Sequence, residues 1–233
     1  MKPKLLVLCP SRGRPGRLKE MLESFIDTQT CSRIKVFLDN DDPLIEDYQQ
    51  AIGNKSSFTI DFRKNTTEIL NEAVKLCQQH EYYMVTNDDF IYHTKGWDSM
   101  LISAIEERGG VGIAYGNDLL AGVQMPTTSV ISGNIVRALG WIQLPGLKHL
   151  YGDNVWREIG LRAGCLTHHK WIIIEHKHAF KERSLLDDGY IRVNSKEMYQ
   201  HDEKVFIDWV KEGMAECVEK VKKLKEEHGK YQG

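Results

Sequence analysis

Two adjacent carboxylates follow a short apolar run near the middle of the chain. Residues 83–91 begin with apolar side chains and then reach Asn87, Asp88 and Asp89. A buried strand with this ending would bring the carboxylates to the rim of a sheet, where open α/β folds bind their ligands. Because neighbouring carboxylates repel each other, they favour a cation beside them. We interpret the pair as part of a divalent-metal site that holds a phosphorylated substrate.

Three other strand-like runs also end in residues that could take part in chemistry. Arg12 and Arg14 follow the run at residues 5–9, and Asp39 follows the run at residues 34–38. His176 and His178 follow the run at residues 171–175. Since each group follows an apolar run, all of them could point to the same rim. Carboxylates with an imidazole suit Mn²⁺ or Mg²⁺ and leave positions open for phosphate oxygens. A zinc site would require more His or Cys at closer spacing, which this pattern lacks.

Each of these features, taken alone, also has a purely structural explanation. An Asp-Asp pair at a strand end is common in solvated turns, and Asp39 begins an Asx-rich turn before Pro43 that needs no ligand. Asp153 lies just before a predicted helix and could cap it. The combination of these features in this order along the chain favours the functional interpretation.

The segments between these groups alternate between strand-like and helix-like patterns. Apolar residues at helical spacing predict helices over residues 17–27, 69–79, 96–108, 135–139, 154–161 and 203–227. Continuous apolar runs such as residues 5–9 are typical of central parallel strands that are covered on both faces. Residues 181–199 are polar and irregular, and we expect a mobile loop there. The alternation predicts an α/β fold.

Composition sets the broad class of the protein. A chain of 233 residues that is 41% hydrophobic can form one large domain with a substantial core. A net charge of −2 does not indicate bulk electrostatic binding to nucleic acid or to an anionic membrane. The five scattered cysteines form no Cys-x-x-Cys pair, so we expect neither a disulfide framework nor a zinc knuckle. No apolar run has the length of a signal peptide or a membrane span, and we expect a soluble, cytoplasmic protein.

Together these residues resemble a known family, the GT-A fold glycosyltransferases, and in particular glycosyltransferase family 2 with its small bacterial and phage relatives. The resemblance extends from Leu5 to about Phe180. Residues 8–12 resemble the family's opening strand with its nucleotide-binding turn, and Asp39 stands where the family has an acid that contacts the nucleobase. Residues 87–89, followed by 96–98, are similar to the Asp-x-Asp metal motif. Residues 148–156 resemble the acceptor segment with the catalytic acid, and residues 174–178 resemble the distal histidine segment. One departure is that Asn87 stands at the first position of Asp-x-Asp, so the metal would rest chiefly on Asp89.

The resemblance implies an α/β, GT-A fold with a Rossmann-like central sheet that is mixed but mostly parallel, flanked by helices, and followed by a long C-terminal helix. We expect a single GT-A-like domain over residues 1–233. Residues 1–100 would form the half that binds the nucleotide-sugar, residues 101–200 the half that binds the acceptor, and residues 203–230 the C-terminal helix.

The same resemblance implies a metal-dependent glycosyltransferase that moves a sugar from a nucleotide-sugar, expected to be a UDP-sugar, to an acceptor hydroxyl with inversion. The residues implied in donor binding are Pro10, Ser11, Arg12, Arg14, Asp39 and Asp88. Metal binding would be carried by Asp89 with His176 or His178. Asp153 would be the general base. The metal would be Mn²⁺ or Mg²⁺. Residues 181–199 would close over the donor and exclude water.

Two other functions stay open on the sequence alone. A nucleotidyltransferase would also use paired carboxylates and Mg²⁺, but we would expect a Gly-rich opening turn, whereas this turn has only Gly13 and Gly16. A sugar-nucleotide- or glycan-binding protein could keep the metal site without catalysis. We expect the acceptor to be a glycan, a lipid-linked sugar or, as an alternative, a hydroxylated base in phage DNA, whose phosphodiester the basic segment 162–171 could contact. The oligomeric state is left open.

Overall fold

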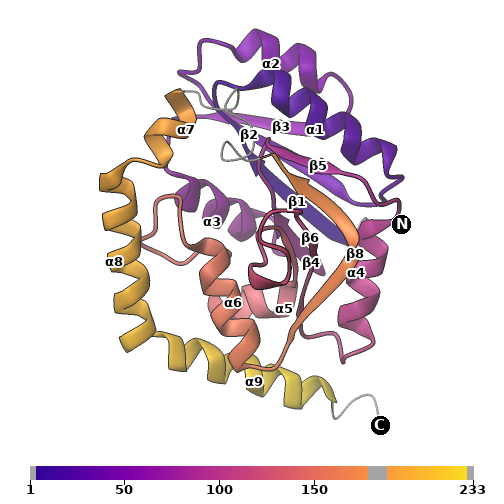
Figure 1. Ribbon diagram of the computed structural model, residues 1–233, viewed down its shortest axis with the longest axis vertical. Helices are drawn as coiled ribbons and strands as arrows, with labels where there is room; N and C mark the ends of the chain where they lie inside the picture. Colours follow the sequence, from indigo (N-terminus) through magenta and orange to yellow (C-terminus); the bar gives the residue numbers. More distant parts are fainter. Residues whose placement is uncertain (1–3, 178–187, 230–233) are drawn as a thin grey trace.

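An eight-stranded mixed sheet organises the part of the chain that the computed structural model describes, residues 4–177 and 188–229 (Figure 1). The strands lie in the order β3-β2-β1-β4-β7-β6-β8-β5. Their bounds are β1 Leu5–Pro10, β2 Arg33–Asp39, β3 Ser57–Asp61, β4 Tyr82–Val85, β5 Phe90–Tyr92, β6 Ile113–Asn117, β7 Ser129–Ser132 and β8 Leu166–His176. Four of the seven pairings are parallel, including all those among β3, β2, β1 and β4. The predicted mixed, mostly parallel sheet is confirmed.

Helices cover both faces of this sheet. Their bounds are α1 Pro15–Asp27, α2 Ile45–Ile52, α3 Thr66–Leu76, α4 Trp97–Glu106, α5 Gly133–Leu139, α6 Gly152–Arg162, α7 Asp188–Val193, α8 Lys196–Glu212 and α9 Met214–Gly229, with a short 3₁₀ helix η1 at Gly122–Gln124. One hydrophobic core lies between the sheet and α1, α2 and α4. A second core lies between the other face and α3, α5, α6, α8 and α9. The predicted α/β architecture flanked by helices is therefore confirmed.

Strand β1 shows how the sequence pattern produces this layering. Leu5, Val7 and Cys9 contribute to the core that contains α1, whereas Leu6 and Leu8 contribute to the core that contains α3. None of the five is more than 5% exposed. A strand covered on both faces needs apolar side chains at every position, which is why its sequence is a continuous apolar run.

The predicted C-terminal helix is two helices. Helix α8 ends at Glu212, Gly213 lies between, and α9 begins at Met214 and runs in a different direction (Figure 1). The N–H of Gly213 still donates to the carbonyl of Trp209, but glycine has one of the lowest helix propensities. The apolar positions that suggested one continuous face belong to two helices that pack on the same core.

The segment predicted to be a mobile loop, residues 181–199, is mostly helical where the structure describes it. Residues 188–193 form α7, and residues 196–199 form the first turn of α8. Ser195 caps α8, because its side chain accepts a hydrogen bond from the N–H of Met198. Ser at this position is a helix-start signal that the prediction of a loop overlooked. Residues 181–187 lie outside the described part of the chain.

Strand β8 is longer than the predicted run at residues 171–175. It covers Leu166–His176, so most of the basic segment 162–171 lies within the sheet. The strand pairs in parallel with β6 and, towards its end, antiparallel with β5. The second pairing places Phe90 opposite His176, which brings the end of β8 beside the carboxylate pair.

No helix within residues 4–177 and 188–229 combines the length and the apolar character that crossing a membrane requires.

Helix α5 is held close to the start of β4, and this approach generates a first prediction. The N–H of Gly133 donates to the carbonyl of Glu81 at 2.6 Å. A Cβ at Gly133 would lie 2.5 Å from the carbonyl oxygen of His80 and 2.9 Å from that of Glu81. Because backbone atoms must move to relieve this clash, Gly133→Ala should lower the free energy of unfolding by about 1–3 kcal/mol in urea titrations.

The matched control is Gly16→Ala in helix α1. A Cβ at Gly16 would meet no atom within 4 Å, and alanine favours the helix by about 0.5–1 kcal/mol over glycine. The control should therefore leave stability unchanged or raise it. Equal stabilities of the two variants would contradict the close approach of α5 and β4.

Candidate active site

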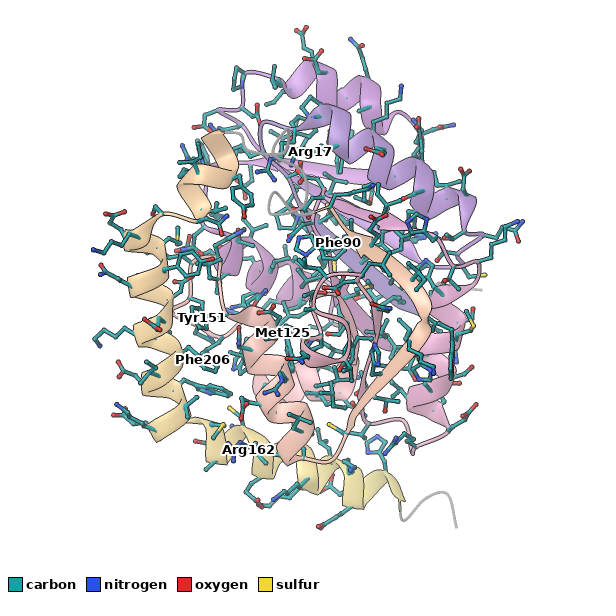
Figure 2. The ribbon with its side chains drawn as sticks, viewed as in Figure 1. Arg17, Phe90, Met125, Tyr151, Arg162 and Phe206 are labelled. Atoms are coloured by element: carbon teal, nitrogen blue, oxygen red, sulfur yellow. The ribbon has the colours of Figure 1, made fainter. Side chains whose placement is uncertain are left out.

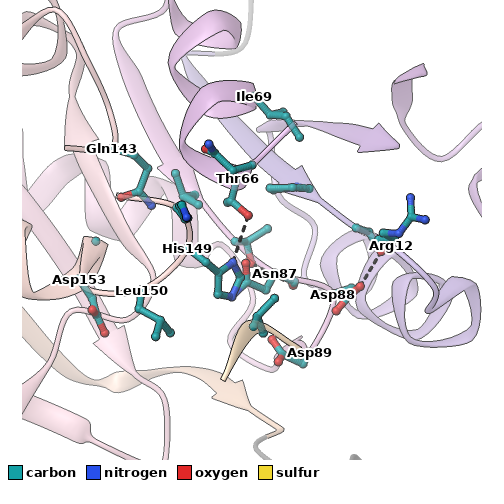
Figure 3. Close-up of a pocket in the computed structure, with 18 of the residues that line it drawn as sticks. Arg12, Thr66, Ile69, Asn87, Asp88, Asp89, Gln143, His149, Leu150 and Asp153 are labelled. Atoms are coloured by element: carbon teal, nitrogen blue, oxygen red, sulfur yellow. Dashed lines mark hydrogen bonds between the residues drawn. The ribbon is translucent and has the colours of Figure 1, made fainter. Parts of the chain in front are cut away.

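One cavity of about 750 Å³ lies at the carboxyl ends of β1, β2 and β4 (Figure 3). It is lined by nine of the ten residues singled out from the sequence, namely Pro10, Ser11, Arg12, Arg14, Asp39, Asp88, Asp89, Asp153 and His176. The tenth, His178, lies outside the described residues. The expectation that these distant segments converge on one rim is therefore met for all the predicted site residues that the structure describes.

Asp88 is buried and is held by the turn that follows β1. Ser11 Oγ donates to Asp88 Oδ2 at 2.5 Å, and Arg14 Nη1 lies 3.4 Å from Asp88 Oδ1. Tyr48 OH, which is 2.8 Å from Ser11 Oγ, supports the serine. Burial and the neighbouring Asp89 raise the pKa of Asp88, whereas Arg14 and Ser11 act in the opposite direction. A further positive charge at this position would favour the ionised carboxylate.

Asp89 faces the end of strand β8. Its Oδ2 lies 3.6 Å from His176 Nε2, and the His176 ring stacks on Phe90 with 4.4 Å between centroids. Burial alone would raise the pKa of Asp89, but His176 and Arg14 outweigh it and hold that pKa below its usual value. The other carboxylate oxygen, Oδ1, is buried and has no hydrogen-bond partner among the described residues. Such an oxygen is a vacant acceptor for a cation.

The donor set at this end of the cavity fits a cation that is shared with a bound ligand. The described residues contain no group of three or more His, Cys, Asp or Glu side chains that could hold a metal ion. Asp89 and His176 nevertheless provide an oxygen and a nitrogen side by side. A carboxylate with an imidazole suits Mn²⁺, and phosphate oxygens would supply the remaining ligands.

The turn after β1 is fixed by acids that follow β2. Arg12 Nη1 donates to Asp39 Oδ2 at 3.0 Å and also to the carboxylate of Asp41. The N–H of Gly13 donates to Asp42 Oδ2 at 2.7 Å. Asp42 Oδ1 accepts from the N–H of Leu44, so this part of the turn is Asx-like as its composition suggested. The structural and functional interpretations of residues 39–43 are thus compatible.

Asp153 lies in the first turn of α6 and lines the other side of the cavity from the carboxylate pair (Figure 3). The cap residue of α6 is Tyr151, so Asp153 is not the cap residue, although its carboxylate accepts a hydrogen bond from an N–H of the first turn. Burial raises the pKa of Asp153, and the N–H of Asn154, which donates to Oδ1 at 2.9 Å, acts against this. A partly buried carboxylate with a raised pKa is suited to general-base chemistry.

Sequence reasoning missed the residue that holds the segment before Asp153. Asp202 in α8 is completely buried, and its carboxylate accepts hydrogen bonds from three consecutive N–H groups, those of Lys148, His149 and Leu150, at 2.9, 2.9 and 2.7 Å. In the sequence, Asp202 is one acid among the charged residues of a predicted helix, and nothing marks it as buried. Only the packing of α8 against the loop shows its role.

Tyr151 connects the same loop to α8 through its ring. Its backbone has a φ of +66°, a region that non-glycine residues rarely adopt. Its ring stacks on Phe206 of α8 with 5.3 Å between centroids (Figure 2). The stacking and the Asp202 hydrogen bonds together fix the entry into α6, and with it the position of Asp153.

Comparison by sequence finds no matching protein family and no matching curated protein. Comparison by structure finds clear similarities. The mannosyltransferase PcManGT from Pyrobaculum calidifontis, in complex with GDP-Man and Mn²⁺, matches 95% of this chain and 73% of its own, with a TM-score of 0.59 and 10% identity. TarS from S. aureus, in complex with UDP, matches 73% of this chain with a TM-score of 0.56 and 13% identity. This chain covers 59% of that TarS chain.

A third similar structure is glucosyl-3-phosphoglycerate synthase from Mycobacterium tuberculosis, in complex with Mn²⁺, UDP and phosphoglyceric acid. It matches 76% of this chain and 72% of its own, with a TM-score of 0.54 and 12% identity. The chain has a GT-A fold. In this GT-A fold the carboxylate pair follows β4, and Asp153 begins α6 beside the same cavity. The division of the GT-A domain into two functional halves stays a prediction.

The Asp202 contacts generate a second prediction. Asp202→Asn replaces a charged acceptor of three N–H groups with a neutral amide, so we expect the free energy of unfolding to fall by about 1.5–3 kcal/mol. The control is Asp208→Asn in the same helix. That exposed carboxylate pairs with Lys204 one turn away, at 2.7 Å, and its loss should leave the free energy of unfolding unchanged.

The difference in unfolding free energy between wild type and Asp202→Asn should depend on pH in a defined direction. Burial alone would raise the pKa of Asp202, but the N–H groups of the loop and His201 outweigh it and hold that pKa below its usual value. The contribution of Asp202 is therefore complete above the unfolded pKa, near about pH 4, and is lost as the pH falls through the native pKa. The difference in unfolding free energy between wild type and Asp202→Asn should shrink below about pH 4, and growth on acidification would contradict this.

Proposed function

We propose that the protein is a metal-dependent glycosyltransferase that transfers a sugar from a nucleotide-sugar, a UDP-sugar, to an acceptor hydroxyl with inversion. One observation carries the proposal. On a GT-A fold, a single cavity has a largely buried carboxylate pair with a histidine at one side and a partly buried aspartate, Asp153, at another. The first group suits a diphosphate with its cation, and the second suits an attacking hydroxyl.

The donor nucleotide is proposed to bind between the turn after β1 and the acids after β2. Arg12 and Asp39 form an ion pair at 3.0 Å that offers both a donor and an acceptor to a ribose or a base. Arg14 lies beside Asp88 and adds positive charge where the diphosphate would lie. The UDP in the TarS structure and the GDP-Man in the PcManGT structure support a nucleotide-sugar as the ligand class.

A divalent cation, Mn²⁺ or Mg²⁺, is proposed at Asp89 and His176. The Mn²⁺ in two of the similar structures supports this proposal. The vacant Asp89 Oδ1 and the adjacent imidazole would hold the ion together with phosphate oxygens. When bound, the ion would offset the charge that develops on the leaving diphosphate.

Asp153 is proposed as the general base. Its carboxylate would take the proton of the acceptor hydroxyl while that oxygen attacks the anomeric carbon. As this new bond forms, the bond from the anomeric carbon to the phosphate oxygen breaks, and the nucleoside diphosphate leaves with the bonding electrons. A single displacement of this kind inverts the anomeric carbon.

The role of Asp153 gives a third prediction. Asp153→Asn should lower kcat by about 10²–10⁴-fold, because the amide cannot accept the proton, and should leave the Kd of the donor unchanged. Transfer would be measured with UDP-, GDP- and CMP-sugars in the presence of Mn²⁺. The control is Glu158→Gln on the same helix, whose carboxylate pairs with Arg157 and Arg162 and not with the cavity residues.

The rate of transfer should also depend on pH in a defined direction. The base acts only when ionised, so the rate should fall as the pH is lowered through the pKa of Asp153, which burial holds above that of an ordinary aspartate. Unchanged transfer by Asp153→Asn would rule out this role. Donor binding without transfer by the wild-type protein would instead favour the non-catalytic binding function.

The proposed cation site gives a fourth prediction. In wild type, Mn²⁺ should increase the thermal stabilisation that the donor produces, because a ligand that binds only the native state raises its stability. Asp89→Asn should remove the Mn²⁺-dependent part. Asp61→Asn is the control, since Asp61 is an exposed carboxylate at the end of the edge strand β3 and pairs with Lys64. An equal Mn²⁺ effect in both variants would exclude Asp89 as a ligand.

A further inference from the structure

His149 occupies the space between the two ends of the cavity. In Figure 3 its imidazole lies between Asp153 on one side and Asn87 with the carboxylate pair on the other. Asp89 and Arg14 are close enough to influence its pKa electrostatically. None of the roles proposed above uses this residue.

The ring of His149 is fixed from two separate elements. The backbone N–H of His149 is one of the three that donate to Asp202 of α8, at 2.9 Å, and it fixes the main chain that carries the ring. Its Nδ1 lies 3.1 Å from Thr66 Oγ1 at the first residue of α3. The start of α3 is itself held by a capping box formed by Asn65 and Glu68. A side chain held in this way has a defined orientation before any ligand binds.

The other ring nitrogen of His149 is available to a ligand. Nε2 makes no hydrogen bond to the residues that the structure describes, while the residue lines the cavity. Burial lowers the pKa of His149 and so favours the neutral ring, and the opposing effects of Asp202 and Asp89 do not reverse this. A neutral imidazole that is paired at one nitrogen can form one directed hydrogen bond through the other.

The following step rests on the proposed function. With the diphosphate at Asp89 and the acceptor hydroxyl at Asp153, the anomeric carbon and its sugar must lie between these two residues. We propose that His149 is a sugar-recognition residue whose Nε2 hydrogen-bonds a hydroxyl of the transferred sugar, and that Thr66 is the positioning residue that fixes its ring. A site that hydrogen-bonds a hydroxyl in this way discriminates strongly against a sugar that lacks it.

The test compares a nucleotide-sugar with its free nucleotide. Kd values would be measured by titration calorimetry with Mn²⁺ for UDP-Glc, UDP-GlcNAc and GDP-Man, and for UDP and GDP. His149→Phe keeps a planar ring but removes both nitrogens. It should weaken the binding of the preferred nucleotide-sugar by about tenfold, as expected for one lost hydrogen bond, and leave the Kd of the free nucleotide unchanged. His149→Gln, which keeps a polar group near the Nε2 position, should recover part of the loss.

Thr66→Val retains the shape of the side chain and tests the positioning role without altering the histidine. It should weaken the same nucleotide-sugar by a smaller factor and also leave the free nucleotide unaffected. Equal weakening of sugar-bound and free nucleotide would show that His149 only supports the loop, and unchanged binding of both would show that it contacts neither. Either result overturns the inference and leaves the proposed function standing. Failure of wild type to bind any of these nucleotides would overturn the proposed function and the inference with it.

A second arm identifies the hydroxyl. Monodeoxy analogues of the preferred donor would be compared in wild type and in His149→Phe. One analogue should bind about tenfold more weakly than the parent sugar in wild type and as well as the parent in the variant. If every analogue loses the same factor in both proteins, His149 makes no hydrogen bond to the sugar.

Discussion

Two buried carboxylates on neighbouring residues cannot both be ionised unless positive charge approaches them, and this constraint governs the whole site. Asp88 accepts a hydrogen bond from Ser11 and lies beside Arg14, both in the turn after β1. Asp89 lies beside His176 at the end of β8. These partners lie about 75–90 residues away on either side in the sequence. The parallel pairing of β1 with β4 and the antiparallel pairing of β5 with β8 bring them together. The topology of the sheet therefore supplies the partners that the two carboxylates require.

The other side of the cavity is built on different principles. Here the important contacts join a side chain to backbone groups, because the Asp202 carboxylate binds three consecutive N–H groups of one loop. The stacking of Tyr151 on Phe206 holds a backbone conformation that would otherwise be costly. Helix α8 thus acts on the site without lining most of it. It determines where His149 and Asp153 lie relative to the carboxylate pair.

The strand ends could be predicted from the sequence because each is a property of a short stretch. An apolar run followed by Asp, Arg or His is visible in ten residues, and parallel strands place such ends at one rim. The contact of Asp202 with the loop spans more than 50 residues and involves backbone donors that every residue possesses, so no side-chain pattern announces it. The Thr66 and His149 pair is equally hidden, since each looks like an ordinary polar residue at a helix start or in a loop. Gly213 is a sequence signal for the break between the two helices. The apolar positions on both sides of it pack on one core, however, and their spacing is that of a continuous helix.

The order in which the chain is made gives the Asp202 contact a consequence for biosynthesis. The ribosome releases β1, β4 and the carboxylate pair well before it releases α8. A nascent chain that ends before residue 202 can pair these strands, yet its 148–150 segment has no acceptor for the three N–H groups. The side of the cavity that holds Asp88 is thus able to form during translation, whereas the side that holds Asp153 takes its final position only when α8 docks.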